Sequence, residues 1–269
     1  MVALTGCRDM KNQSTSFEKG YADVNGIHMY YEIHGQGSPL VLIHGAGSTI
    51  YTTYGRIIGE LSKTWRVIGV ELQAHGHTSD RDAELSFEQD ADDVAELMRQ
   101  LKIGNADVIG FSNGGTTALQ LAVRHPDKVQ RVISASALLK KDGAFPQFWD
   151  FMSNATLDQM PIQYRNTFLE INGDSAALKN MHDKCVRRML SMKDMSDEDL
   201  RSIKAPVLLV VADKDVATPE HMVQMSRLIP DCRLAVIPGV HGEFLGEITT
   251  VKEGEGTFEI MPILYKFFR

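Results

Sequence analysis

The clearest signal of the fold lies in ADVIGFSNGGTTALQLAVRH, residues 106–125. Residues 106–110 form a short apolar run typical of a buried strand, and residues 114–125 have a helical pattern that stops before Pro126. The turn between them, G-F-S-N-G, matches G-x-S-x-G, in which small glycines permit a tight turn that exposes the serine hydroxyl. This context predicts that Ser112 is a nucleophile. The alternative is a serine that only caps the following helix.

Strand-like and helical patterns alternate on both sides of this stretch. Asn25-Gly26 predicts the turn of a hairpin, and residues 87–101 and 220–229 have helical patterns. Apolar runs that are typical of strands buried on both faces occur at residues 39–43, 65–70, 129–134, 206–212 and 233–237. We therefore expect an α/β fold, with a doubly wound, mostly parallel sheet between layers of helices.

The alternation stops between residues 140 and 202. This segment has no strand-like run, but it holds six of the 13 methionines and six of the 20 aromatic residues. We interpret it as an inserted helical cap; the alternative is an ordinary helical subdomain whose methionines and aromatic residues fill its own core. The predicted organisation is a flexible leader at residues 1–19, a core at residues 20–139 and 203–269, and the cap at residues 140–202.

Composition and charge exclude several classes of function. The chain has 28 basic and 35 acidic side chains and a net charge of −7, without a long basic cluster that would bind nucleic acid. Its longest apolar runs fall far short of the roughly 18 residues that a membrane-spanning helix needs. We therefore expect a globular protein with no nucleic-acid partner and no membrane-spanning segment.

The cysteines bear on the compartment. Cys7, Cys185 and Cys232 have neither the number nor the spacing of a disulfide framework or a zinc site, so we expect free thiols. Residues 4–7, L-T-G-C, resemble a bacterial lipoprotein cleavage box, but the residues before Cys7 lack the apolar stretch of a secretory signal. As the chain stands we expect a cytoplasmic protein. The alternative is a cell-envelope lipoprotein whose start is truncated before Leu4.

A nucleophilic serine needs a base and a group that orients the base. The strand predicted at residues 206–212 runs into Asp213-Lys214-Asp215, and the strand at 233–237 runs into P-G-V-H, which ends at His241. The carboxyl ends of parallel strands share one edge of the sheet, so these groups are expected near Ser112. The chain order is Ser, Asp, His, which is the order of α/β-hydrolases.

From about Tyr21 to the C-terminus the sequence resembles the α/β-hydrolase family with a helical cap. Residues 44–47, H-G-A-G, resemble the oxyanion loop of the family, and residues 71–78, E-L-Q-A-H-G-H-T, resemble its D-x-R-G-x-G-x-S loop. Glu71, Gln73-Ala74 and Thr78 depart from that second pattern. The P-G-V-H loop is one residue shorter than the common P-G-x-G-H.

The resemblance implies roles for individual residues. The family places its acid four residues before a proline, as Asp215 stands before Pro219, so Asp215 is expected to be the acid and Asp213 to support the turn. Some relatives take the acid from the end of the strand at 129–134, but the residues that follow it here contain no carboxylate. The oxyanion hole is expected to consist of the backbone N–H groups of Ala46 and Asn113.

We therefore predict a serine hydrolase that cleaves a carboxylic ester or lactone through an acyl-enzyme formed on Ser112, with His241 as base and Asp215 as acid. Other triad hydrolases, namely peptidases, C–C hydrolases and haloperoxidases, remain alternatives, as does a small-molecule receptor with little turnover. Relatives that use an aspartate at this turn, the haloalkane dehalogenases and epoxide hydrolases, do not fit Ser112. The expected partner is a small-molecule substrate, with no cofactor, and the oligomeric state is left open.

No metal is expected either. His75 and His77 alternate in a loop, but the local sequence supplies no further ligands, and His44 is expected to support the backbone of the oxyanion loop.

Overall fold

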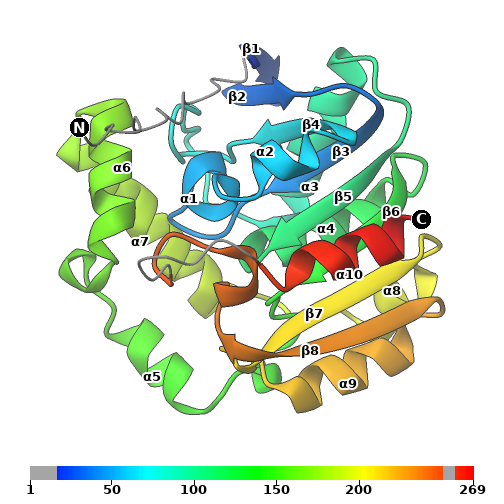
Figure 1. The fold of residues 1–269 in the computed structure, drawn as a ribbon. Coiled ribbons are helices and arrows are strands. Elements are labelled where there is room, and N and C mark those ends of the chain that lie inside the picture. The colour runs from blue at the N-terminus through cyan, green and yellow to red at the C-terminus, as the bar shows by residue number, and fades with distance from the viewer. Residues whose placement is uncertain (1–16, 251–257) are drawn as a thin grey trace, which may run out of the picture.

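The structure, a computed structural model, describes residues 17–250 and 258–269, and an eight-stranded sheet runs through its centre (Figure 1). The strand order is β1-β2-β4-β3-β5-β6-β7-β8. Strand β2 is antiparallel to both β1 and β4, and every other neighbouring pair is parallel. The strands are β1 (Glu18–Val24), β2 (Ile27–His34), β3 (Ser38–Ile43), β4 (Trp65–Val70), β5 (Ala106–Phe111), β6 (Val129–Ala135), β7 (Val207–Lys214) and β8 (Cys232–Val240). The predicted doubly wound, mostly parallel sheet is confirmed.

The N-terminal hairpin begins two residues earlier than predicted. Glu18 pairs with Ile33 and Lys19 with Glu32, because β2 is long enough to pair with these two residues of the predicted leader. The turn lies where Asn25-Gly26 predicts it, with positive φ angles of 45° and 88°. Residues 1–16 of the predicted leader, including Cys7 and the residues that resemble a lipoprotein cleavage box, lie outside the described residues.

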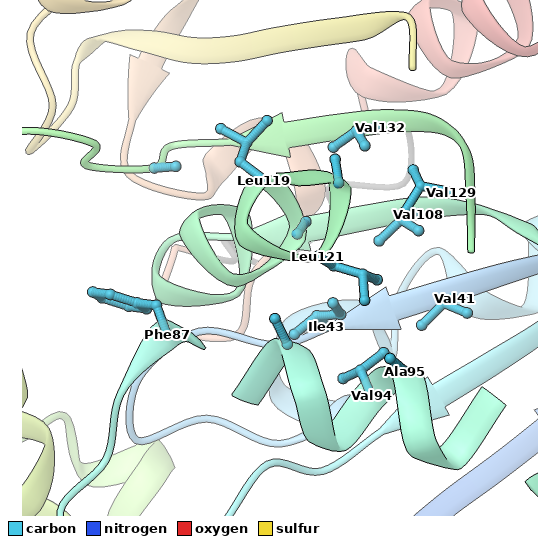
Figure 2. Close-up of a cluster of buried hydrophobic side chains, with 14 of the residues drawn as sticks. Val41, Ile43, Phe87, Val94, Ala95, Val108, Leu119, Leu121, Val129 and Val132 are labelled. Atoms are coloured by element: carbon cyan, nitrogen blue, oxygen red, sulfur yellow. The ribbon is translucent and has the colours of Figure 1, made fainter. Parts of the chain in front are cut away.

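Each central strand sends alternate side chains into two apolar layers. Val41 and Ile43 of β3 belong to a buried cluster that also contains side chains of α3 (Phe87–Gln100), α4 (Asn113–Arg124) and α9 (Pro219–Leu228). Leu40 and Leu42 of the same strand face the opposite layer, which contains α1 (Ile50–Tyr54), α2 (Ile58–Leu61) and α10 (Ile260–Phe268). Figure 2 shows the first layer, with side chains of α3 and α4 pointing at those of β3, β5 and β6. Both faces of the central strands are therefore buried, as their continuous apolar runs predict. The prediction is wrong for β8, where Val236 is 46% exposed, because β8 is the last strand of the sheet and has a neighbour on one side only.

The segment between β6 and β7 is helical. It contains the 3-10 turns η1 (Lys141–Gly143) and η2 (Leu157–Gln159) and the helices α5 (Gln147–Ser153), α6 (Ile162–Asn172), α7 (Ser175–Ser191) and α8 (Asp197–Ser202). Helices α5 to α7 lie together at one end of the sheet, at the left in Figure 1. By contrast, α8 packs against α4 and α9 beside the sheet.

Some methionines and aromatic residues of this segment form a small core of their own. Met160, Phe168 and Met181 are buried together with Leu85 and Ala74 from the chain after β4. The helices α6 and α7 therefore pack on a loop of the sheet domain, and apolar side chains attach them to it. In the part of the chain that the structure describes, no helix has the length and apolar character required to cross a membrane.

Candidate active site

Ser112 occupies a sharp turn between the end of β5 and the start of α4. Its backbone has φ 54° and ψ −122°, a left-handed conformation that a non-glycine residue rarely adopts. The flanking glycines explain how the turn closes. A Cβ atom on Gly110 would lie 2.0 Å from the carbonyl oxygen of Gly114, and one on Gly114 would lie 2.3 Å from the carbonyl oxygen of Ile43. The Ser112 hydroxyl accepts no hydrogen bond from α4, so the capping alternative is wrong.

The structure brings the three predicted side chains into contact in series. Ser112 Oγ lies 3.1 Å from Nε2 of His241, and Nδ1 of His241 lies 2.5 Å from Oδ1 of Asp215. Asp215 can only accept at this contact, so Nδ1 carries the proton and Nε2 is free to accept from Ser112. The phenyl ring of Phe111 packs against the imidazole, with ring centroids 4.8 Å apart. This arrangement can activate the hydroxyl of Ser112 as a nucleophile.

The carboxylate of Asp215 is buried and held by several donors. Oδ2 accepts from the Ser136 hydroxyl at 2.5 Å and from the Ala212 N–H at 3.2 Å, and Oδ1 accepts from the Val216 N–H at 2.7 Å. Burial alone would raise the pKa of Asp215, but the charge and hydrogen bond of His241, with the Ser136 hydroxyl and the Ala212 N–H, hold it below its ordinary value. Asp215 is therefore ionised at neutral pH.

Asp213, the other acid of this loop, makes no hydrogen bond to the imidazole in the described part of the chain. Its side chain is exposed, and Oδ1 accepts from the Gly239 N–H at 2.7 Å, which ties the end of β7 to β8. Of the two carboxylates between which the sequence leaves a choice, only Asp215 contacts His241 in the described structure.

Ser136 was not identified from the sequence. It follows β6, at the edge position from which some relatives supply the acid, and here its hydroxyl donates to Asp215 instead. The signal available in the sequence was its place two residues after the strand predicted at 129–134, at the same edge as Ser112 and Asp215.

The predicted oxyanion groups lie beside the serine. Ala46 and Asn113 both line the cavity that contains Ser112 and His241. Within residues 17–250 and 258–269, the backbone N–H groups of Ala46 and Asn113 have no hydrogen-bond acceptor. As the first residue of α4, Asn113 has no acceptor within its own helix, so its N–H is free to bind a ligand. Two unpaired donors next to a nucleophile can stabilise a developing negative charge.

Two buried histidines hold the loop that carries Ala46. His44 donates from Nδ1 to the Gly45 carbonyl at 2.7 Å and accepts the Leu72 N–H at 3.0 Å. His75 donates from Nδ1 to the Gln73 carbonyl at 2.8 Å, which leaves its Nε2 to accept the Gly47 N–H at 3.0 Å. Burial lowers the pKa of His44 to about 3 and that of His75 to about 4, so both imidazoles stay neutral and can accept. This role of His75 was not predicted from the sequence.

The loop that departs from the family pattern is held by its own side chains. The carboxylate of Glu71 accepts the His77 N–H at 2.7 Å, and the Thr78 hydroxyl donates to the Glu71 carbonyl at 2.7 Å. In the described ranges no three His, Cys, Asp or Glu side chains gather in a way that could hold a metal ion. Cys185 and Cys232 are unpaired thiols, and burial raises the pKa of both.

A cavity of about 240 Å³ opens above Ser112. Helices α5 to α7 supply much of its wall, including Phe151, Met152, Met181, Val186 and Met189. None of its lining residues, all of which belong to the described part of the chain, is Lys, Arg, Asp or Glu. Tyr164 of α6 also lines it and donates its hydroxyl to the buried carboxylate of Glu247 at 2.8 Å, which connects the helical segment to the chain after His241. The cavity suits an uncharged, mostly apolar ligand.

Comparison with known proteins finds hydrolases that are similar to this chain. The sequence model described as the alpha/beta hydrolase fold matches residues 38–195. The 2-hydroxymuconate semialdehyde hydrolase of Pseudomonas sp. (strain CF600) is 36% identical over 112 residues, which are 40% of this chain and 39% of that protein. The pimeloyl-[acyl-carrier protein] methyl ester esterase of Neisseria meningitidis serogroup A is 29% identical over 230 residues, 76% of this chain and 71% of that protein.

A solved serine hydrolase involved in carbazole degradation, CarC, superposes with a TM-score of 0.76 at 18% identity and covers 94% of this chain and 99% of its own. At that identity the likeness shows the fold alone. The first curated relatives match over less than half of their own length, so their activities do not transfer directly to this chain.

Proposed function

The chain belongs to the alpha/beta hydrolase fold family, and from that premise we propose that it is a serine hydrolase that cleaves a carboxylic ester or a lactone through an acyl-enzyme. The observation that carries the proposal is the contact series from Ser112 through His241 to Asp215, at the floor of an apolar cavity. The two unpaired N–H groups of Ala46 and Asn113 support it, because acyl transfer needs a site for the oxyanion.

In the first half of the reaction, Ser112 Oγ attacks the carbonyl carbon of the substrate while Nε2 of His241 takes the hydroxyl proton. The N–H groups of Ala46 and Asn113 bind the negative oxygen of the tetrahedral intermediate. Asp215 stays ionised and stabilises the imidazolium through its Nδ1–H. When the intermediate collapses, the C–O bond of the ester breaks and His241 returns the proton to the leaving oxygen.

In the second half, water attacks the ester formed on Ser112, and His241 takes a proton from that water and then returns it to Ser112 Oγ. The product acid leaves with the acyl group. For a lactone, the alcohol released in the first half remains attached to the acyl chain, so one hydroxy acid is the product.

The test of this assignment is the Ser112→Ala variant. We expect the wild-type chain to hydrolyse p-nitrophenyl esters with repeated turnover and to be labelled once by a fluorophosphonate. In Ser112→Ala the labelling should disappear and kcat should fall by about 10⁴-fold or more. The matched control is Ser226→Ala, which removes a hydroxyl on α9 whose hydrogen bond, among the described residues, goes to the Val223 carbonyl of the same helix.

Three outcomes count against the proposal. Unchanged ester hydrolysis in Ser112→Ala would refute Ser112 as the nucleophile. Wild-type chain that is acylated once without further turnover would favour the receptor alternative. A wild-type chain that reacts with no fluorophosphonate and no ester would refute the serine hydrolase itself.

A second candidate is the hydrolysis of 2-hydroxymuconate semialdehyde, because the relative of that name is 36% identical over its matched region. That compound carries a carboxylate, whereas no Arg or Lys belongs to the described lining of the cavity, so we place the ester or lactone first. A direct absorbance assay with that semialdehyde distinguishes the two candidates.

A further inference from the structure

Asn113 has an unpaired side-chain amide at the centre of the site. It directly follows Ser112 and lines the same cavity, and the residue as a whole is only 6% exposed. The amide nitrogen Nδ2 has no hydrogen-bond partner among the described residues. The buried amide of Gln73 provides the contrast, because its Nε2 donates to Asp80 at 2.8 Å and to the Ala83 carbonyl at 3.1 Å. The unpaired amide of Asn113 therefore needs an explanation.

Buried polar groups in folded proteins are almost always paired, because an unpaired one has lost its hydrogen bonds to water without replacement. Nδ2 itself has almost no accessible surface, so a substrate in the cavity can supply the missing partner once the amide turns about its Cβ–Cγ bond, a soft rotation for asparagine. The stability that the free protein gives up at Asn113 would then be recovered on binding, and only by ligands with a suitable polar atom.

The position of Asn113 limits which polar atom of the substrate can pair with its amide. Its backbone N–H belongs to the proposed oxyanion hole, so the reacting carbonyl lies against the same residue during catalysis. The substituents nearest to its side chain are then those on the carbon next to that carbonyl. The amide is uncharged and has both a donor and an acceptor end, which complements a hydroxyl group better than an ammonium or a carboxylate group.

We propose that the Asn113 side chain binds a hydroxyl group on the carbon adjacent to the reacting carbonyl, so that the enzyme prefers esters of 2-hydroxy acids with an apolar remainder. This inference rests on the proposed function and deepens it. The apolar remainder follows from the wall of the cavity, where Met181, Val186 and Met189 face the same space.

The experiment measures kcat/KM for ethyl 2-hydroxyhexanoate and for ethyl hexanoate, with the wild-type chain and with Asn113→Leu. The rate of proton release is the signal. Leucine has the same branched outline as asparagine, although it is larger, and it keeps the backbone N–H while it replaces the amide with two methyl groups. The preference of each protein is its kcat/KM for the 2-hydroxy ester divided by its kcat/KM for ethyl hexanoate. A 2-hydroxyl also changes the intrinsic reactivity of an ester, and this effect cancels when the preference of the wild-type chain is divided by that of Asn113→Leu. Met181→Leu, an apolar change in the same cavity, is the matched control.

We expect the preference for the 2-hydroxy ester to be about tenfold or more larger in the wild-type chain than in Asn113→Leu. Any loss of kcat/KM that Asn113→Leu causes equally for both esters cancels in this ratio, and Met181→Leu should keep the wild-type preference. A hydroxyl held at one position also predicts different kcat/KM values for the two enantiomers, and this difference should shrink in Asn113→Leu. A purely structural role of Asn113 would not change the enantiomer ratio.

The remaining outcomes overturn the proposal in distinguishable ways. If Asn113→Leu keeps the wild-type preference, or lowers kcat/KM equally for both esters, the side chain does not bind the 2-hydroxyl. If the wild-type chain cleaves both esters equally after correction for intrinsic reactivity, this inference fails and the proposed function stands. If it cleaves neither ester and is not labelled by a fluorophosphonate, the proposed function fails and the inference falls with it.

Discussion

The edge of the sheet and the helices above it contribute to the site by different kinds of contact. Asp215, at the sheet edge, accepts four hydrogen bonds, from Ser136, Ala212, Val216 and His241. The helices α5 to α7 present methionine and aromatic side chains, whose contacts are adaptable and have no preferred direction. This difference suggests that directional bonds at the sheet edge determine the chemistry, while the helices determine which substrates fit.

The largest expected effect tests the sheet edge itself. Asp215→Asn should lower kcat by about 10⁴-fold, because an amide can donate to Nδ1 and so favour the tautomer in which Nε2 carries the proton. Asp213→Asn, two residues away, should change kcat by no more than a few-fold, since Asp213 contacts Gly239 and not the imidazole. Steady-state kinetics with one p-nitrophenyl ester measures both. Equal losses in the two variants would show that the loop as a whole, and not the contact with His241, is what matters.

The residues at the sheet edge could be predicted from the sequence. Ser112, Asp215 and His241 each follow an apolar run at a strand end, so local patterns place them at one edge of the sheet before any coordinates are known. The sheet follows from the same alternation of strands and helices. The N-terminal boundary was off by two residues because pairing with β2, and not the composition of the leader, sets where β1 begins.

Residues whose roles depend on distant partners were missed. Ser136 bonds to Asp215, Gly47 to His75, and Tyr164 to Glu247, and each pair lies far apart in the sequence. A single sequence contains no pattern for such contacts, because the fold and not the local spacing brings the partners together. The three roles became visible only with coordinates.

The second prediction concerns the buried histidines under acid. The pKa of His75 is about 4 in the folded chain and 6.5 for an ordinary histidine, so between these pH values the unfolded chain takes up a proton that the folded chain does not. Acidification in this window therefore destabilises the protein, by on the order of 2–3 kcal/mol from His75 at pH 4.5. Urea denaturation at pH 7.0 and 4.5 measures the loss, which should be smaller in His75→Gln.

Protonation of Asp215 contributes little to the loss of stability between pH 7.0 and 4.5. Its pKa is lowered in the folded chain, so the stability it contributes is present above its ordinary value of 3.8 and is lost only as the pH falls through the lower, folded value. Glu32 and Glu96, whose pKa values are lowered from 4.5, begin to lose their contribution at the lower end of this window in both proteins, so the difference between wild type and His75→Gln is what reports on His75. His44, with a pKa of about 3, and His221, with a pKa of about 4, destabilise in the same direction and remain in His75→Gln. An identical pH dependence in wild type and variant would contradict the assignment of His75 as a neutral buried group.

The third prediction tests whether His75 acts through the oxyanion loop. His75→Phe keeps a ring but removes the acceptor of the Gly47 N–H, so the loop that carries Ala46 loses one of its fixed points. We expect kcat to fall by about 10²-fold with little change in KM, because a displaced donor weakens the transition state more than the bound substrate. His75→Gln, whose side-chain oxygen can accept, should recover much of the loss. If both variants change KM and leave kcat unaltered, His75 supports the cavity and not the oxyanion hole.

The smallest expected effect tests the helical side of the comparison. Tyr164→Phe removes the hydroxyl that donates to Glu247, a residue that is 1% exposed and keeps the Thr249 N–H as a donor at 2.9 Å. The loss of one hydrogen bond to a carboxylate that keeps another donor should lower the free energy of unfolding by about 1–2 kcal/mol. Tyr164 lines the cavity above the serine, and in the described part of the chain its hydroxyl bonds to Glu247 and to none of the three reacting side chains. We therefore expect KM to rise by about two- to fivefold and kcat to stay nearly constant. Tyr51→Phe, at a tyrosine that is 67% exposed, is the control and should change neither value. If kcat falls as much as in His75→Phe, the contact of Tyr164 with Glu247 positions the imidazole of His241. The helices would then contribute to the chemical step as well as to substrate fit.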